Sequence, residues 1–202
     1  MRGNCSIGID FGTTNTVIAL ARPGERVRAV AFRDDGELLD LYRSVLCFER
    51  LSASRHDIQA QAGSKAIRAY LGSIYETRFI QSLKSHVASP LFDETRIFGR
   101  GYKFEDLLSV FFRHAIADAD VQLFEPGGRV VAGRPVAFVG AGPDEALAIQ
   151  RYGEAYRRVG ILDPAYVYEP VGAAYYYGPA PHRRCAGSSL RFWRRDQRFL
   201  AD

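Results

Sequence analysis

The fold of this chain is decided by one stretch near its start, Ile7-Gly8-Ile9-Asp10-Phe11-Gly12-Thr13-Thr14-Asn15-Thr16. Apolar residues alternate with small or polar ones up to Gly12, and a second β-rich run, Val17-Ile18-Ala19-Leu20-Ala21, follows directly. The pattern predicts a β-hairpin whose turn lies at residues 12–15.

The turn is made of residue types that bind phosphate. Gly12 lets the backbone approach a ligand closely, and successive N–H groups with the hydroxyls of Thr13 and Thr14 can bond phosphate oxygens. Asp10 is suited to hold a hydrated magnesium ion, which prefers oxygen ligands and keeps several waters. The Gly-Lys-Ser/Thr ending of a P-loop is absent, and no Gly-x-Gly-x-x-Gly opens a helix here. We therefore expect Mg-ATP as the ligand, with an ordinary Gly/Asn turn as the alternative.

Composition limits the class of protein. The 202 residues suit one domain or two lobes, and no apolar run reaches the about 20 residues of a membrane span. No hydrophobic signal segment precedes the first strand, so we expect a cytoplasmic protein without a membrane partner. Metal-ligand or disulfide spacing is absent among the cysteines and histidines, which are Cys5, Cys47, Cys185, His56, His86, His114 and His182.

The net charge of +4 is confined to the end of the sequence. Residues 179–202 contain six Arg and two Asp, which account for the whole excess. The first 178 residues are neutral and show no basic patch, so we do not expect a nucleic-acid partner.

Hydrophobic periodicity predicts alternating strands and helices, and hence an α/β fold. In addition to the opening hairpin, the expected strands are residues 26–32, 44–48, 134–140 and 165–168. Residues 26–32 and 44–48 should continue the hairpin as a β-meander. The expected helices are residues 62–71, 104–119, 144–159 and 171–177. In the third helix the apolar face should comprise Ala146, Ile149, Tyr152, Tyr156 and Val159.

A second motif stands at Tyr168-Glu169-Pro170-Val171-Gly172-Ala173-Ala174-Tyr175. It places a carboxylate at a helix start and follows it with small residues that allow close packing. Taken alone, the motif is better explained by helix capping through an acidic residue, with Gly and Ala present for packing.

Together the two motifs resemble the seventy-kilodalton heat-shock (DnaK-type) chaperone family of the actin-like ATPase superfamily. The resemblance covers residues 7–178 and is closest to the YegD-like branch, through Arg78-Phe79-Ile80-Gln81-Ser82-Leu83-Lys84 and Gly133-Arg134-Pro135-Val136. It implies that residues 1–178 form the first lobe of an actin-like, ribonuclease H-like ATPase, a mixed sheet with flanking helices.

The resemblance also implies roles for single residues. The first phosphate loop would consist of Gly12, Thr13, Thr14 and Asn15. Asp10 would bind magnesium through water, and Lys84 and Glu169 would be catalytic. Lys84 would orient the attacking water, unless it is a solvated surface lysine, and Glu169 would lie near the phosphates and the hinge. Pro135 resembles the proline that helps to relay the nucleotide state.

The family couples ATP hydrolysis to a conformational change that acts on protein clients during the stress response, together with co-chaperones. Clients and co-chaperones of this protein cannot be named from its sequence. Two alternatives stay open: a sugar-kinase or actin-like relative that phosphorylates a small substrate, and a non-catalytic binding module whose basic tail recruits an acidic partner.

After Gly178 the family would continue with an apolar strand and a second phosphate loop, Asp-x-Gly-Gly-Gly-Thr, which this sequence does not contain. Residues 190–199 can be encoded as CTG CGA TTT TGG CGG CGG GAC CAG CGA TTT. When the reading frame starts one base later, the same nucleotides encode Cys-Asp-Phe-Gly-Gly-Gly-Thr-Ser-Asp. We therefore expect residues 179–202 to be a frameshifted, aberrant basic tail, with a disordered basic tail as the alternative. A truncated lobe without the second loop and the adenosine pocket should be deficient in ATPase activity.

Overall fold

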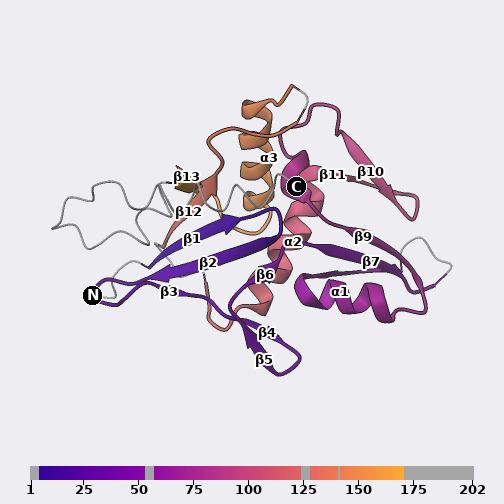
Figure 1. Cartoon of the computed structure of the whole chain (residues 1–202), viewed down its shortest axis with the longest axis horizontal. Coiled ribbons are helices and arrows are strands. Elements are labelled where there is room, and N and C mark those ends of the chain that lie inside the picture. Colours follow the sequence, from indigo (N-terminus) through magenta and orange to yellow (C-terminus); the bar gives the residue numbers. More distant parts are fainter. Residues whose placement is uncertain (1–4, 53–56, 124–127, 141, 171–202) are drawn as a thin grey trace, which may run out of the picture.

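The computed structural model of the chain describes residues 5–52, 57–123, 128–140 and 142–170. These residues form a mixed α/β fold with one larger sheet, a smaller sheet and two separate hairpins (Figure 1). Within the described ranges, no helix is long and apolar enough to cross a membrane. The predicted helix at residues 171–177 and the tail at residues 179–202 lie outside the description.

The opening hairpin forms as predicted. β1 (Ser6–Phe11) and β2 (Asn15–Ala21) run antiparallel, with Asp10 opposite Val17. Alternate residues of β1 are buried, and Asp10 lies on the opposite, exposed face of the strand. The period-two pattern therefore decides which face of the hairpin enters the core.

The larger sheet combines antiparallel and parallel pairing. Its strand order is β13-β12-β1-β2-β3, and β6 also pairs with β2. The strands that complete it are β3 (Arg28–Ala29), β6 (Tyr42–Arg43), β12 (Arg129–Arg134) and β13 (Ala165–Tyr168). β12 runs parallel to β1, and β13 runs parallel to β12. Parallel neighbours need long crossover connections, and a helix lies in each of the two connections here.

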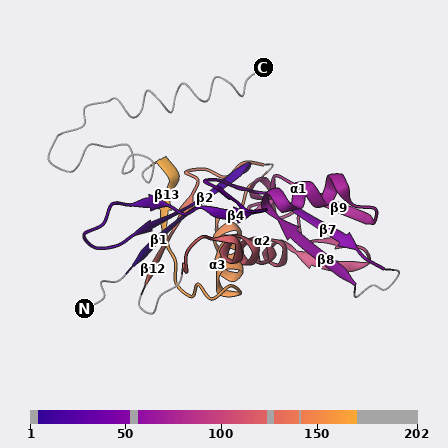
Figure 2. The same ribbon diagram turned by 90° about the horizontal axis from the view of Figure 1, so that it is seen from below.

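Helices α2 (Phe104–Asp118) and α3 (Glu145–Arg157) cover one face of this sheet (Figure 2). The helix predicted at residues 104–119 is confirmed, and it buries Leu107, Leu108, Phe111, Phe112 and Ala115 on one face. The ring centroid of Phe111 lies 5.3 Å from that of Phe11. Asp144 caps α3 by accepting a hydrogen bond of 2.9 Å from the Leu147 N–H.

The apolar face predicted for α3 is right in part. Tyr152 and Tyr156 are buried, with side chains stacked at a ring distance of 6.4 Å. Ala146 is exposed and Ile149 only partly buried, because the core-facing stripe begins one residue before Ile149, at Ala148.

The smaller sheet was not predicted as a separate unit. Its strands are β7 (Leu46–Arg50), β8 (Ile58–Ala62) and β9 (Glu76–Ile80), in the order β8-β7-β9. Helix α1 (Gly63–Gly72) follows β8 and confirms the helix expected near residue 62. The strand expected at residues 44–48 is β7, displaced by two residues, and it leaves the predicted meander to enter this second sheet.

Two hairpins complete the described fold. They are formed by β4 (Phe32–Asp34) with β5 (Glu37–Leu39), and by β10 (Glu94–Ile97) with β11 (Arg100–Lys103). The prediction of a single strand at residues 26–32 is therefore wrong, because this segment contains β3 and the first residue of β4 as two separate strands. Asp35 and Gly36 turn the first hairpin with positive φ angles of 51° and 85°.

The strand predicted at residues 134–140 is also wrong. β12 ends at Arg134, and the side chains of Val136 and Val139 are 61% and 67% exposed. The ladder with β1 uses Arg129 to Ala132. Pro135 follows the strand directly and has no N–H with which to extend the pairing.

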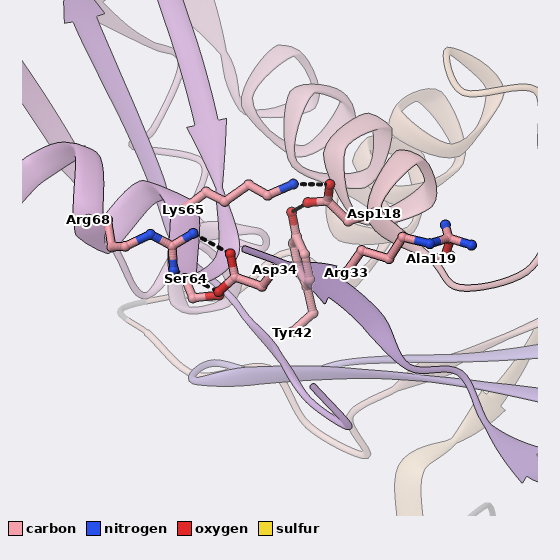
Figure 3. A network of polar contacts seen from close by, with 8 residues as sticks. All are labelled: Arg33, Asp34, Tyr42, Ser64, Lys65, Arg68, Asp118 and Ala119. Carbon is pink, nitrogen blue, oxygen red and sulfur yellow. Dashed lines mark hydrogen bonds and ion pairs between the residues drawn. The ribbon is translucent and has the colours of Figure 1, made fainter. Parts of the chain in front are cut away.

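A charged network fastens the β4–β5 hairpin to α1 (Figure 3). Asp34 forms a two-point ion pair with Arg68, whose Nη1 lies 2.8 Å from Oδ2, and accepts a hydrogen bond of 2.6 Å from Ser64. The bond from Arg68, reinforced by that from Ser64, lowers the pKa of Asp34 to about 2 from its usual 3.8, against the opposing effect of burial.

A second set of contacts ties α1 and β6 to α2 (Figure 3). Lys65 pairs with Asp118, which accepts a hydrogen bond of 2.9 Å from the Tyr42 hydroxyl. The Tyr42 ring lies against Gly63, where a Cβ would come within 2.8 Å of the ring and where φ is +67°. Only glycine fits this position without strain.

We expect Asp34→Asn to lower the free energy of unfolding by about 1–2 kcal/mol at neutral pH, since Arg68 is partly exposed. Asp34 has a lower pKa in the folded protein than in the unfolded chain. The stabilisation that its carboxylate provides is therefore present above pH 3.8 and disappears as the pH falls toward 2. Urea unfolding of both proteins across this pH range measures the effect. Asp35→Asn, at the exposed neighbouring residue, is the control. A deficit of the same size near pH 2 and at neutral pH would contradict the assignment.

Candidate functional site

Three parallel strands end beside one another at the same edge of the larger sheet. Asp10 is the penultimate residue of β1, Gly133 is the penultimate residue of β12, and Glu169 follows β13 directly. The register pairs Ile9 with Ala132, which puts Asp10 beside Gly133. In open α/β sheets, ligands bind outside the carboxyl ends of the strands, so this edge is the candidate site.

Gly133 lies beside the side chains of two acidic residues. A Cβ added to Gly133 would lie 3.3 Å from Cγ of Glu169 and 3.6 Å from Oδ1 of Asp10. The same point would lie 3.5 Å from the Ile9 carbonyl oxygen. A side chain here would press against Glu169 and come into contact with Asp10, so the glycine leaves room for Glu169 at this position.

Lys84 and Glu169 are in direct contact, although 85 residues separate them in the sequence. The Lys84 Nζ lies 2.5 Å from Oε1 of Glu169, and the two side chains are 13% and 24% exposed. Lys84 lies in the short 3-10 helix η1 (Leu83–His86), which starts after Ser82 at a positive φ of 57°. The structure thus brings together the two residues that the sequence predicted as catalytic.

Tyr152 of α3 is buried within reach of the charges of Glu169 and Asp10, and it was predicted only as a core residue. It is 2% exposed, and its ring makes an edge contact with Phe11 at 6.3 Å. Burial raises the pKa of Tyr152 well above its ordinary value, and the nearby charge of Glu169 raises it further, as does that of Asp10. The hydroxyl therefore stays protonated at neutral pH.

The predicted phosphate loop is a tight turn between β1 and β2. The Gly12 N–H donates to the Asn15 carbonyl oxygen at 3.0 Å, and a Cβ on Gly12 would lie 2.3 Å from that oxygen. Thr13 and Thr14 are exposed, and the Ser44 N–H donates to the Thr14 carbonyl oxygen at 2.9 Å. Glycine is required here by this close approach, and the two hydroxyls are left at the surface.

The donor set at the strand ends fits a magnesium ion held mainly through water. Asp10 is an exposed carboxylate with Glu169 nearby, and magnesium needs only one or two carboxylates when phosphates supply further oxygens. Across the described ranges, no group of three His, Cys, Asp or Glu side chains could hold a metal ion by itself.

The remaining candidates of the sequence lie elsewhere. Pro135 directly follows β12, next to Arg134, whose guanidinium lies 4.9 Å from the Tyr168 ring centroid. His114 lies on α2, where burial lowers its pKa. Cys5 and Cys47 are buried in the core. His56, His182 and Cys185 lie outside the described residues.

No protein-family model matches this chain. The resemblance to the heat-shock family therefore rests on the two sequence motifs.

We expect the Lys84–Glu169 pair to show a coupling free energy of about 1–2 kcal/mol in a double-mutant cycle of Lys84→Met and Glu169→Gln. Each single change leaves a half-buried charge without its partner, whereas the double change removes both charges. Urea unfolding of the four proteins gives the coupling.

The matched control is the exposed pair Arg157 and Glu154, for which the same cycle should give about 0.3–0.5 kcal/mol. Equal coupling in the two cycles would show that the Lys84–Glu169 contact is no stronger than a surface ion pair.

Proposed function

We propose that residues 1–178 are the first lobe of an actin-like, heat-shock-chaperone-like ATPase that binds Mg-ATP at the carboxyl ends of β1, β12 and β13. The observation that carries the proposal is the meeting of Asp10, Lys84 and Glu169 at that edge, from three distant parts of the chain. The mixed sheet with two helices on one face supports the same assignment.

In this proposal each residue has a definite task. Asp10 holds magnesium through water, and Gly12, Thr13, Thr14 and Asn15 bind phosphate oxygens. Magnesium, when bound, supplies positive charge against the negative phosphate oxygens. Positioning and electrostatic stabilisation carry most of phosphoryl-transfer catalysis.

Lys84 and Glu169 act as a unit in this scheme. Lys84 orients the attacking water, and Glu169 fixes the ammonium group through the ion pair of 2.5 Å. Because a lysine side chain is long and flexible, this second contact restricts the positions that its charge can occupy.

We also propose that residues 179–202 are read in a shifted frame and that the parent gene encodes the second phosphate loop there. The single codon of Trp193 forces a glycine in the shifted reading, and the remaining matches use ordinary codons. The parent would be a cytoplasmic ATPase that acts on protein clients, and the chain in its present form would hydrolyse ATP poorly.

Millimolar Mg-ATP should raise the melting temperature of the 202-residue chain by no more than about 1–2 °C. The reason is that one lobe contacts only one side of the nucleotide, and a ligand near its Kd stabilises by only about 0.4 kcal/mol. Thermal unfolding with Mg-ATP and with Mg-AMP as control measures the shift. A rise of several degrees with Mg-ATP alone would show that this lobe holds a complete site.

Nucleotide sequencing across residues 178–199, followed by restoration of the reading frame, tests the proposed parent. The restored protein should hydrolyse Mg-ATP, and Lys84→Met should reduce the rate by about a hundredfold, whereas Asp35→Asn should leave it unchanged. Codons that cannot yield Asp-Phe-Gly-Gly-Gly-Thr in the shifted frame would contradict the frameshift. A restored protein without hydrolysis would contradict the ATPase assignment.

A further inference from the structure

Arg43 lies next to the predicted phosphate loop, and no sequence motif pointed to it. It belongs to β6, which pairs with β2 in the register Asn15 opposite Arg43 and Thr16 opposite Tyr42. Thr16 also pairs with Phe11 of β1, so β6 lies on the edge of β2 that faces away from β1.

The side chain of Arg43 shares a face of the sheet with Asp10. Tyr42 and Thr16 are buried on the core side, so their neighbours Arg43 and Asn15 point to the opposite side. Asp10 pairs with Val17, two residues from Asn15, and therefore lies on that same side. Two strand spacings across the sheet and two residues along it separate Arg43 from Asp10, so their Cα atoms are about 12 Å apart.

Three hydrogen bonds join the Arg43 segment to the loop. Arg43 Nη1 donates to Oδ1 of Asn15 at 3.0 Å, and the Ser44 N–H donates to the Thr14 carbonyl oxygen at 2.9 Å. The hydroxyls of Ser44 and Thr16 bond each other at 3.0 Å in a buried position. The backbone at Arg43 and Ser44 is thus fastened to the loop, and the exposed guanidinium is directed to Asn15.

The charge of Arg43 is left available for a ligand. Within the described part of the chain, its recorded partner is the neutral amide of Asn15, and it forms no ion pair there. The Lys84 ammonium, in contrast, is already paired with Glu169. The loop itself offers only N–H and hydroxyl groups, and Asp10 and Glu169 add negative charge at the strand ends.

We propose that Arg43 is a phosphate-binding residue of this lobe, which contacts an anionic oxygen of a polyphosphate ligand and orients Asn15. The planar guanidinium can keep its bond to Asn15 and still present further N–H groups to a phosphate, as a lysine could not. The inference rests on the proposed function, because it takes the turn at residues 12–15 as a phosphate loop.

The test is a titration of the 202-residue chain with magnesium tripolyphosphate, followed by amide chemical shifts of Gly12, Thr13 and Thr14. Inorganic tripolyphosphate isolates the phosphate contacts from those of the nucleoside. Chemical shifts report millimolar binding that hardly changes the melting temperature. In the unchanged chain these signals should move in proportion to the ligand concentration.

Arg43→Met should reduce the initial slope of these shifts about five- to tenfold, the loss expected for one charge-assisted hydrogen bond. The control is Arg28→Met, which removes one exposed arginine of β3, paired with Leu20 at the far end of β2. Arg28 forms an ion pair with Asp120, so this change removes a positive charge of the same sheet that lies away from the loop. It should leave the slope within a factor of two, since screening weakens distant surface charges.

The possible outcomes separate the two proposals. Loop signals that do not move in the unchanged chain would overturn the proposed function and the role of Arg43 with it. Loop signals that move equally in the unchanged chain and in Arg43→Met would overturn the role of Arg43 alone. An equal loss in Arg43→Met and Arg28→Met would reduce the effect to net charge and also overturn that role.

Discussion

The parallel pairing of β12 with β1 is the constraint on which the rest of the structure depends. More than a hundred residues separate the two strands in sequence, and they include the smaller sheet, α1, both hairpins and α2. Because β12 enters beside β1 in the same direction, its carboxyl end places Gly133 next to Asp10. β13 repeats the step and delivers Glu169 to the same edge. The long insertion is then positioned so that η1 returns Lys84 to that edge.

The charged side chains at the carboxyl ends of β1, β12 and β13 affect one another. Two carboxylates that approach the same glycine repel each other, and the Lys84 ammonium offsets the charge of Glu169 directly. The buried hydroxyl of Tyr152 remains protonated, because burial raises its pKa and the charges of these acids raise it further. Asp10 is left exposed and without a lysine or arginine partner in the described part of the chain. Such a carboxylate is free to interact with a hydrated cation.

Local sequence patterns predicted the elements whose own residues determine their structure. The opening hairpin, α1, α2, α3 and β13 follow from alternation, helical periodicity and stop signals such as Gly160, whose φ is 88°. The position of β12 could not be chosen in this way. Residues 129–134 and 134–140 both contain apolar residues typical of strands, and only the pairing with β1 selects the first.

The candidate site was predictable to a similar degree. Asp10, Lys84 and Glu169 were found because they stand in motifs that resemble a family. Gly133, Tyr152 and Arg43 were not given roles, since their importance arises from the neighbours that the fold brings to them. A glycine that ends a strand or an arginine in a two-residue strand carries no signal in the sequence. Register and three-dimensional contact supply it.

The central claim is that the carboxyl ends of β1, β12 and β13 hold the metal and the phosphates of a nucleotide. Paramagnetic broadening by Mn²⁺ with ATP tests it most directly, because Mn²⁺ accepts the oxygen ligands that suit Mg²⁺ and broadens only nearby signals. The account predicts that the amide signals of Asp10, Thr13 and Gly133 broaden first, while those of α1 (Gly63–Gly72) stay sharp. Broadening that spares the three strand ends, or that centres on the acids of another part of the fold, would contradict it.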